Sequence, residues 1–232
     1  MDFSRFKPWC WLLLLLGPLG CSHVPVLREA TVASYVPDNV HREEPTLPPQ
    51  IKRVAVLPLT TLSDDAATEF GRETLAPLLY EELGRSRQFE VVLVTAEQLR
   101  LATGRSAWTG EEQFPLDFFE LLREKLGMDA VLFSRLTQYR AYEPLSIGWR
   151  LKLFETEAPR ILWAVDEVFD GRVPEVAAAA RRFSRQHPEA NSASDGQEVL
   201  SSPLRFGRYT TSAVVATLPR HQAGQAGQVG LH

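Results

Sequence analysis

Both cysteines of this chain, Cys10 and Cys21, lie within its first 21 residues, so the chain has no thiol from Ser22 onward. Disulfide frameworks, Cys-X-X-Cys redox pairs and Cys-rich zinc sites are therefore impossible in its body. The composition suits one globular domain with a tail or two, because 44% of the 232 residues are hydrophobic and 23% are charged. The formal net charge of −4 gives no electrostatic reason to expect nucleic acid as a partner.

The N-terminal segment has the pattern of a secretory signal. Arg5 and Lys7 precede a short apolar run at residues 9–16, and small residues follow it. A helix that spans a bilayer needs about 20 apolar residues, so this run is too short to be one. We therefore expect residues 1–20 to be a signal peptide that is cleaved off.

The end of this signal resembles that of bacterial lipoproteins, because Leu19 and Gly20 directly precede Cys21. It departs from their pattern at Pro18, where Leu is usual. The resemblance implies cleavage before Cys21, acylation of its thiol and its new amino terminus, and stable membrane anchoring. Because Ser22 stands where Asp would signal retention in the inner membrane, the implied destination is the outer membrane, facing the periplasm. The alternative is an ordinary secretory signal with a coincidental Cys.

The mature chain divides into three parts by composition. Residues 21–50 contain five prolines and no sustained apolar period, which predicts an extended, lipidated tether. Residues 51–220 carry the periodic apolar pattern of a folded domain. Residues 221–232 are rich in Gly, Ala and Gln and are expected to be a disordered tail.

The apolar pattern of the domain predicts an α/β fold, with a mixed sheet of about five strands and packed helices. Asp64 and Asp65 offer an N-cap for the first helix, Thr95 one for the second, and Gly84 and Gly127 offer C-terminal stops. Strands are expected at residues 53–59, 89–94, 129–139, 147–153 and 161–165, and helices at 66–85, 96–102, 114–125, 175–187 and 200–218.

Two apolar sets define the expected core contacts. Ile147, Trp149, Leu151 and Leu153 alternate with polar or small residues, which is typical of a half-buried antiparallel strand. The helical stripes are expected to include Phe70, Leu75, Leu78, Leu79 and Leu83 in the first long helix, and Leu204, Phe206, Val214, Val215 and Leu218 in the last.

Three segments of the chain resemble a family of bacterial envelope domains. They are the apolar run at 53–59 with the turn and helix after it, the helix end and strand at 84–92, and the hairpin residues 153–164, which include Ile161-Leu162-Trp163. The family includes the curli-secretion channel lipoprotein CsgG, the penicillin-binding-protein activator LpoB and the N-terminal domain of TolB. The resemblance implies a TolB N-terminal or CsgG-like α/β fold over about residues 51–218. It departs at Glu157-Ala158-Pro159, where the family often has a Thr-Gly turn.

The residue types predict no catalytic or metal site and no cofactor. The five histidines, His23, His41, His187, His221 and His232, leave most of the domain without an imidazole, and no phosphate-binding Gly-rich spacing occurs. The carboxylates Asp166, Glu167 and Asp170 stand together near the end of a strand. They are interpreted as a solvated strand edge, with a carboxylate-dependent hydrolase or a hard-cation site as the alternative.

Two features are candidates for binding a partner. Trp108 lies between two glycines of a loop, where it is either a packed anchor or an exposed contact. Arg181, Arg182 and Arg185 share one helix and form either a solvated face or a contact for an acidic partner or lipid headgroups.

These features predict a non-catalytic outer-membrane lipoprotein that is anchored through Cys21. Its α/β domain would meet a periplasmic or membrane protein, or further copies of itself, in an accessory or assembly role. The alternative functions are a subunit of an oligomeric secretion channel and, with less support, a carboxylate-dependent hydrolase. The channel is disfavoured because the loops at 100–114 and 140–146 are too short or too polar to supply the hairpins it needs.

Overall fold

The computed structural model describes residues 35–187 and 198–221. The expected signal, Cys21, the first part of the expected tether and the expected tail after His221 lie outside the described residues.

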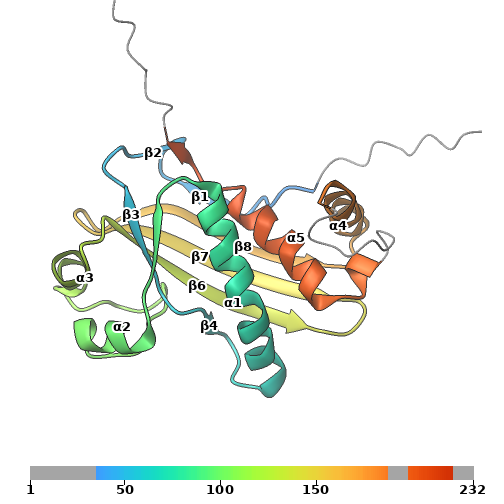
Figure 1. The fold of residues 1–232 in the computed structure, drawn as a ribbon, viewed down its shortest axis with the longest axis horizontal. Coiled ribbons are helices and arrows are strands. Elements are labelled where there is room, and N and C mark those ends of the chain that lie inside the picture. The colour runs from blue at the N-terminus through green and yellow to red at the C-terminus, as the bar shows by residue number, and fades with distance from the viewer. Residues whose placement is uncertain (1–34, 188–197, 222–232) are drawn as a thin grey trace, which may run out of the picture. The chain divides into compact units, whose positions relative to one another are not determined.

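A mixed sheet of seven strands organises the domain (Figure 1). Strands β6, β7 and β8 form an antiparallel meander, and β1 pairs antiparallel with β8 at one edge. β3 is parallel to β6 on one side and to β5 on the other, and the short β4 pairs with β6. The strands are β1 (Val40–Arg42), β3 (Arg53–Val56), β4 (Thr60–Thr61), β5 (Glu90–Leu93), β6 (Ala130–Arg140), β7 (Ser146–Glu155) and β8 (Ile161–Asp170).

Helices cover both faces of this sheet, but unequally. The helices α1 (Ala66–Ser86), α4 (Pro174–Gln186) and α5 (Pro203–Val215), with the 3-10 turn η2 (Glu198–Leu200), contribute to one hydrophobic cluster on the first face. The shorter α2 (Ala96–Thr103) and α3 (Phe118–Leu126) contribute to a second cluster on the opposite face. Figure 1 shows α2 and α3 together at one end of the sheet, away from α4 and α5.

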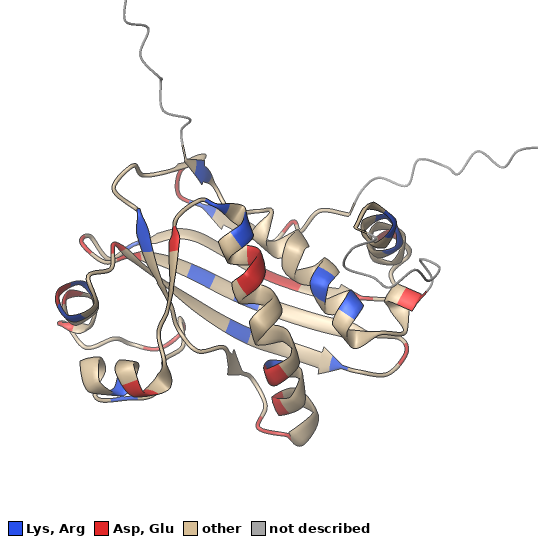
Figure 2. Ribbon diagram, in the orientation of Figure 1, with Lys and Arg blue, Asp and Glu red and all other residues tan. Residues whose placement is uncertain are grey.

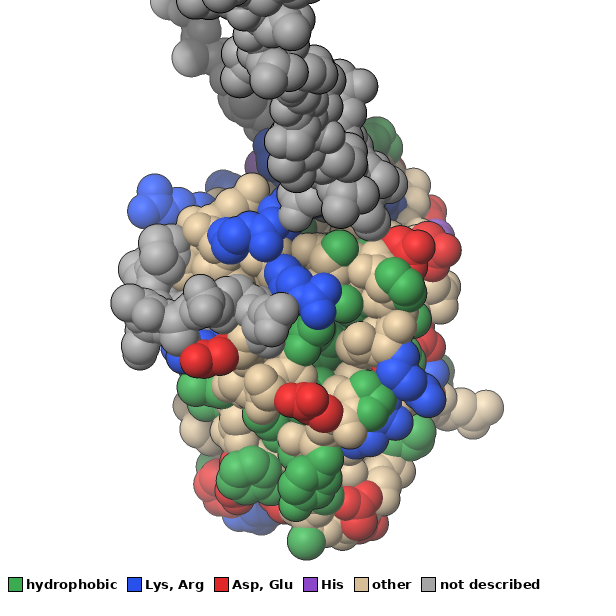
Figure 3. Space-filling view, turned by 90° about the vertical axis from the view of Figure 1, so that its right-hand side faces the viewer, with side chains coloured by type: hydrophobic (Ala, Val, Ile, Leu, Met, Phe, Trp, Pro, Cys, Tyr) green, Lys and Arg blue, Asp and Glu red, His purple; other side chains and the backbone are tan. Residues whose placement is uncertain are grey.

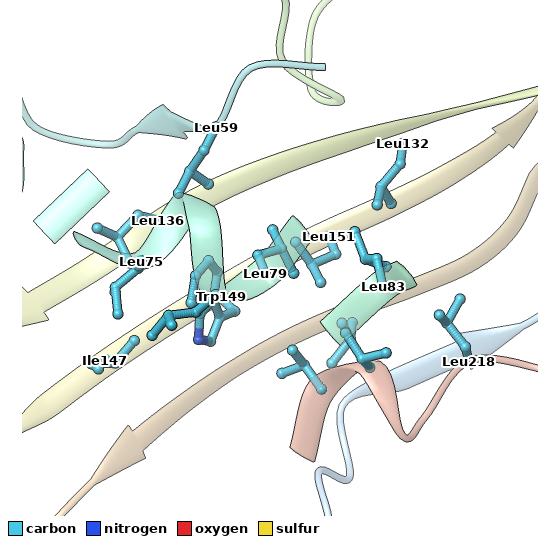
Figure 4. Packing of buried hydrophobic residues seen from close by; sticks show 14 of the residues in the cluster. Leu59, Leu75, Leu79, Leu83, Leu132, Leu136, Ile147, Trp149, Leu151 and Leu218 are labelled. Carbon is cyan, nitrogen blue, oxygen red and sulfur yellow. The ribbon is translucent and has the colours of Figure 1, made fainter. Parts of the chain in front are cut away.

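The first cluster confirms the expected alternation along β7. Ile147, Trp149, Leu151 and Leu153 are all 1% exposed or less. Leucines of α1 point toward these strands in Figure 4. Within this core the indole N–H of Trp149 donates to Thr210 at 3.0 Å, and that of Trp163 donates to Thr217 at 3.1 Å. Both buried indoles are therefore satisfied by hydroxyls from α5 or from the residues directly after it.

The second cluster, which we call the aromatic cluster, includes six aromatic side chains among its aliphatic ones. Phe114 stacks on Phe118 with ring centroids 4.7 Å apart, and it meets the strand residues Phe133 and Phe154 at 5.2 and 5.9 Å. Trp108 completes the group at 4.8 Å from Phe118. The loop before α3 is therefore bound to the sheet by its rings.

The α/β class and the mixed sheet are confirmed, and the strand number is higher than expected. The additional strands β1 and β4 have three and two residues, too few for an apolar period to be visible in the sequence. Helix α1 begins after the N-cap Asp65, whose pKa is lowered to about 2 by hydrogen bonds from Ser63 and Thr68.

Several details of the helices differ from expectation. Helix α1 continues past Gly84 to Ser86, and its C-cap is Arg87, whose φ of 52° is left-handed. Helix α3 begins at Phe118 rather than at Phe114, because Pro115 and the turn that follows it precede the helix. Phe70 and Leu204, expected in the core, are 59% and 45% exposed.

The expected tether contributes to the domain from Tyr35 onward. Tyr35 packs edge-on against Phe169 at 5.6 Å, and burial together with a hydrogen bond to Glu167 raises its pKa. Strand β1 follows, and then β2 (Thr46–Leu47), which pairs in parallel with β9 (Arg220–His221). The ordered domain thus includes residues before the expected start at residue 51. The sequence gives no local signal for these strands, because their partners lie more than 100 residues away.

Gly71 of α1 lies against the ring of Tyr139 on β6, where a Cβ would come within 2.5 Å of the ring. We expect Gly71→Ala to lower the free energy of unfolding by about 1–3 kcal/mol, because the ring has to move within a packed core. Gly84→Ala is the matched control on the same helix, since nothing lies within 4 Å of its Cβ position. It is expected to stabilise the protein by about 0.5–1 kcal/mol. Urea unfolding measures the stability of both variants. Equal effects would contradict the close packing of Gly71 against Tyr139.

Thr210→Val keeps the shape of the side chain and removes the hydroxyl that accepts the indole N–H of Trp149. We expect a loss of about 1–3 kcal/mol in the free energy of unfolding, since a buried donor is left unpaired. Thr74→Val removes an exposed hydroxyl that bonds only its own helix, and it should change stability by no more than about 0.5 kcal/mol. Equal losses in the two variants would show that the buried hydrogen bond between Trp149 and Thr210 stabilises the protein no more than an exposed one.

Candidate partner-binding surface

The second face of the sheet is only partly covered by helices. The aromatic cluster covers β3, β5 and the part of β6 and β7 near Phe133 and Phe154. Beyond it, side chains of β7 and β8 that alternate with buried core residues point to the same face, where no helix of residues 35–187 or 198–221 covers them. Val168 on β8 is 42% exposed there. This open part of the sheet is the surface on which charged side chains gather.

Five residues on this open part form what we call the charged cluster: Glu111, Arg135, Arg150, Lys152 and Asp166. Oxygens of Glu111 lie 3.5 Å from a guanidinium nitrogen of Arg135 and 3.2 Å from Nζ of Lys152. Glu111 also lies 3.9 Å from Arg150, which pairs with Asp166 at 2.6 Å. Figure 2 shows Lys and Arg on these strands of the sheet. One carboxylate is thus shared by three cations from two neighbouring strands.

The loop that carries Glu111 is held close to the sheet. Trp108 donates its indole N–H to Thr103 at 2.8 Å, and the guanidinium of Arg105 lies 4.0 Å above its ring. The carbonyl of Gly110 accepts from Lys152 at 3.1 Å, and a Cβ at Gly110 would come within 3.0 Å of that side chain. The loop backbone therefore lies against the Lys152 side chain, and it places Glu111 directly over the cations.

A hollow of about 240 Å³ adjoins the charged cluster. It is lined by Asn39 and His41 from the β1 edge, by Arg150 and Lys152, and by β8 residues that include Asp166. The hollow therefore offers cationic groups and hydrogen-bonding groups in a space large enough for a few side chains of a partner.

A second hollow, of about 490 Å³, lies between α1, α4 and α5. Its ion pairs centre on Glu81 of α1, which bonds Arg85 one turn away and lies 3.8 Å from Arg208 of α5. Such pairs are ordinary on helices and carry little specific chemistry. The charged cluster differs because three cations from two strands converge on one carboxylate that comes from a loop.

The structure separates the residues expected to bind a partner. Trp108 is 5% exposed. Its ring is therefore a packed anchor of the loop and is not available as an exposed contact. Its environment is the aromatic cluster rather than solvent. Arg181 and Arg182 are half-buried and Arg185 is exposed on α4, away from Trp108. Figure 3 views the molecule from the side on which α4 and α5 lie, and it shows hydrophobic, acidic and basic side chains mixed there rather than one continuous basic patch.

The carboxylates considered for hydrolysis do not converge. Asp166 faces the charged cluster, whereas Glu167 accepts from the backbone of Asp38 at 3.3 Å on the other side of β8. A hydrogen bond from Arg172 lowers the pKa of Asp170, which burial opposes. Hydrolysis by two carboxylates requires both groups to face one site, and these three side chains do not.

Sequence reasoning did not find the charged cluster. Nothing in the spacing of its members brings Glu111 to β6 and β7, and Asp166 was interpreted as part of a solvated strand edge. The alternation along β7 did place Arg150 and Lys152 on one face, which was the available signal. Among the described residues, no group of three or more His, Cys, Asp or Glu side chains is arranged to hold a metal ion.

No family model matches this chain, and a search of curated proteins also found no match. Similar solved structures include PelC from Paraburkholderia phytofirmans, described as a dodecamer, at 15% identity and a TM-score of 0.37 over 72% of this chain and 98% of that one. Lipoprotein GNA1162 from Neisseria meningitidis is 16% identical, with a TM-score of 0.38 over 61% and 99%. The LpoB C-terminal domain from Escherichia coli is 15% identical, with a TM-score of 0.33 over 51% and 82%. These low identities and TM-scores assign no function to this chain.

Glu111→Gln removes the charge that the three cations share, so their mutual repulsion is no longer offset. We expect a loss of about 1 kcal/mol in the free energy of unfolding at about 20 mM salt and a smaller loss at about 500 mM, because salt screens the repulsion. Glu97→Gln breaks an exposed pair with Arg100 on α2 and should have a smaller effect at both salt concentrations. Urea titrations at the two salt concentrations measure this, and a salt-independent loss would argue against a charge effect.

Proposed function

We propose that this chain is a non-catalytic outer-membrane lipoprotein that presents its α/β domain to a protein partner in the periplasm. The observation that carries the anchor is the sequence at residues 1–22, where a basic start and a short apolar run lead to Gly20, Cys21 and Ser22. Several acyl chains on one residue would hold the domain stably at a membrane. No helix within residues 35–187 or 198–221 combines the length and apolarity required to cross a membrane.

The described domain supports a binding role rather than a chemical one. The carboxylates Asp166 and Asp170 each pair with an arginine, which keeps them as ion-pair acceptors and weighs against the hydrolase. The charged cluster and its adjoining hollow instead provide a concave surface with convergent polar groups. We assign the contact with the partner to this surface, in an accessory or assembly role in the cell envelope.

Metabolic labelling with a fatty-acid analogue tests the anchor. The full chain, expressed in a Gram-negative host, is expected to incorporate the label and to fractionate with the outer membrane. Cys21→Ala should abolish incorporation, because the thiol that receives the lipid is absent. Cys10→Ala is the matched control and should be labelled like the unmodified chain, because residue 10 lies in the segment that is removed.

Two outcomes would overturn the anchor: a wild-type chain that is never labelled, and a Cys21→Ala variant that keeps its label. Ser22→Asp tests the destination separately. By resemblance to lipoprotein sorting signals, it is expected to move the labelled protein to the inner membrane, as measured by density-gradient fractionation.

A further inference from the structure

The arrangement around Glu111 resembles a ligand held in a binding site. Arg135 and Arg150 face one another across β6 and β7 in the sheet register, and Lys152 follows on the same face of β7. Their side chains are between 22% and 30% exposed, so they are partly withdrawn from water. Partial burial strengthens their attraction for an anion and their repulsion for one another. Glu111, which comes from a separate loop, offsets this repulsion with a single carboxylate.

The charges of the cluster do not balance. Its three cations face two carboxylates, Glu111 and Asp166, and both of these are engaged with Arg150. Among the described residues that line the adjoining hollow, Asp166 is the single carboxylate, and the other groups there include Asn39 and His41. An anionic group that entered the hollow would meet Arg150 and Lys152 from the open side.

We propose that this surface binds an acidic segment of a partner protein, whose carboxylates take the place of Glu111 on Arg135, Arg150 and Lys152. Glu111 thus acts as an internal competitor that occupies the cations when no partner is present. Arginine favours carboxylates because its planar guanidinium presents several donors at once. Nε of Arg150 already bonds Asp166, and Nε of Arg135 bonds the Thr61 carbonyl. Both arginines turn Nη1 toward Glu111. The inference deepens the proposed function by naming the chemistry of the partner.

The loop geometry explains why the competitor is replaceable. The loop is fixed by Trp108 and by the bond from Lys152 to the carbonyl of Gly110, which do not involve the Glu111 carboxylate. Glu111 itself is held by ion pairs of 3.2–3.9 Å, longer than a close charge-assisted hydrogen bond of about 2.7–2.9 Å. An incoming carboxylate can therefore compete for the cations while the loop keeps its anchors.

Fluorescence anisotropy with a labelled hexaglutamate peptide tests this proposal on the full chain in a nonionic detergent. We expect binding that weakens as salt is raised and that is absent for a hexaglutamine peptide. Lys152→Ala should weaken binding about tenfold or more, since a partly buried charge contact is lost. Glu111→Gln should tighten it about three- to tenfold, because the competitor is removed. An unfolded variant cannot bind more tightly, so this gain of affinity separates the proposal from loss of structure.

Arg100→Ala is the matched control, because Arg100 forms an exposed pair with Glu97 on α2 and lies outside the charged cluster. It should bind like wild type. Equal weakening by Arg100→Ala and Lys152→Ala would indicate nonspecific attraction, and unchanged or weaker binding by Glu111→Gln would overturn the competitor role. Anionic phospholipid vesicles that bind through Lys152 while the peptide does not would replace the protein partner with a lipid surface.

The test also separates this inference from the anchor. Cys21→Ala protein should bind hexaglutamate like wild type. Normal acylation without peptide binding would reject the acidic partner alone, whereas peptide binding without acylation would reject the anchor alone.

Discussion

Two indole N–H groups buried under α5 determine how this helix lies on the sheet. Trp149 and Trp163 are fully buried on the neighbouring strands β7 and β8, and each needs an acceptor because an unpaired buried donor costs about 1–3 kcal/mol. Thr210 and Thr217 supply these acceptors seven residues apart, which is about two helical turns. The C-terminal segment is therefore fixed at two points, and a slide or a rotation would break at least one of the bonds.

The rest of the first face follows from this placement. Leu75 of α1 packs directly against Gly207 of α5, since a Cβ added at Gly207 would lie 2.4 Å from the Leu75 side chain. The two long helices therefore cover the meander together, and this face carries most of the core. The other face has the short helices α2 and α3 over one end alone, which leaves the far ends of β7 and β8 to charged side chains. The charged cluster is thus a consequence of unequal helical cover.

The sequence predicted what local patterns can encode. The alternation of Ile147 to Leu153 identified β7 and its buried face, and Thr95 and Gly127 marked helix ends that the structure confirms. Phe70 and Leu204 were placed in the core wrongly, because a helical stripe is wider than the face that finds a partner. Glycine was expected to end α1, whereas Arg87 adopts the left-handed conformation instead.

Features that depend on distant residues were not predictable in this way. Strand β1 pairs with β8 across more than 100 residues, so its three residues looked like part of a tether. The charged cluster joins a loop to two strands, and its spacing along the chain has no pattern. Trp108 was recognised as a special residue of the loop, but its burial depends on rings of α3 and β6 that come later in the chain.

The mixed sheet also bears on how the chain can assemble. β6, β7 and β8 follow one another through short turns, so their pairing closes small loops and loses little chain entropy. The parallel pair of β3 and β6 joins Val54 to Ala130, and β1 reaches β8 from even farther away. Topology of this kind favours early formation of the meander, with the edges added once it exists. The two Trp-bearing strands would then be present as a template before the N-terminal strands arrive, and Arg150 and Asp166 would already lie opposite one another on it.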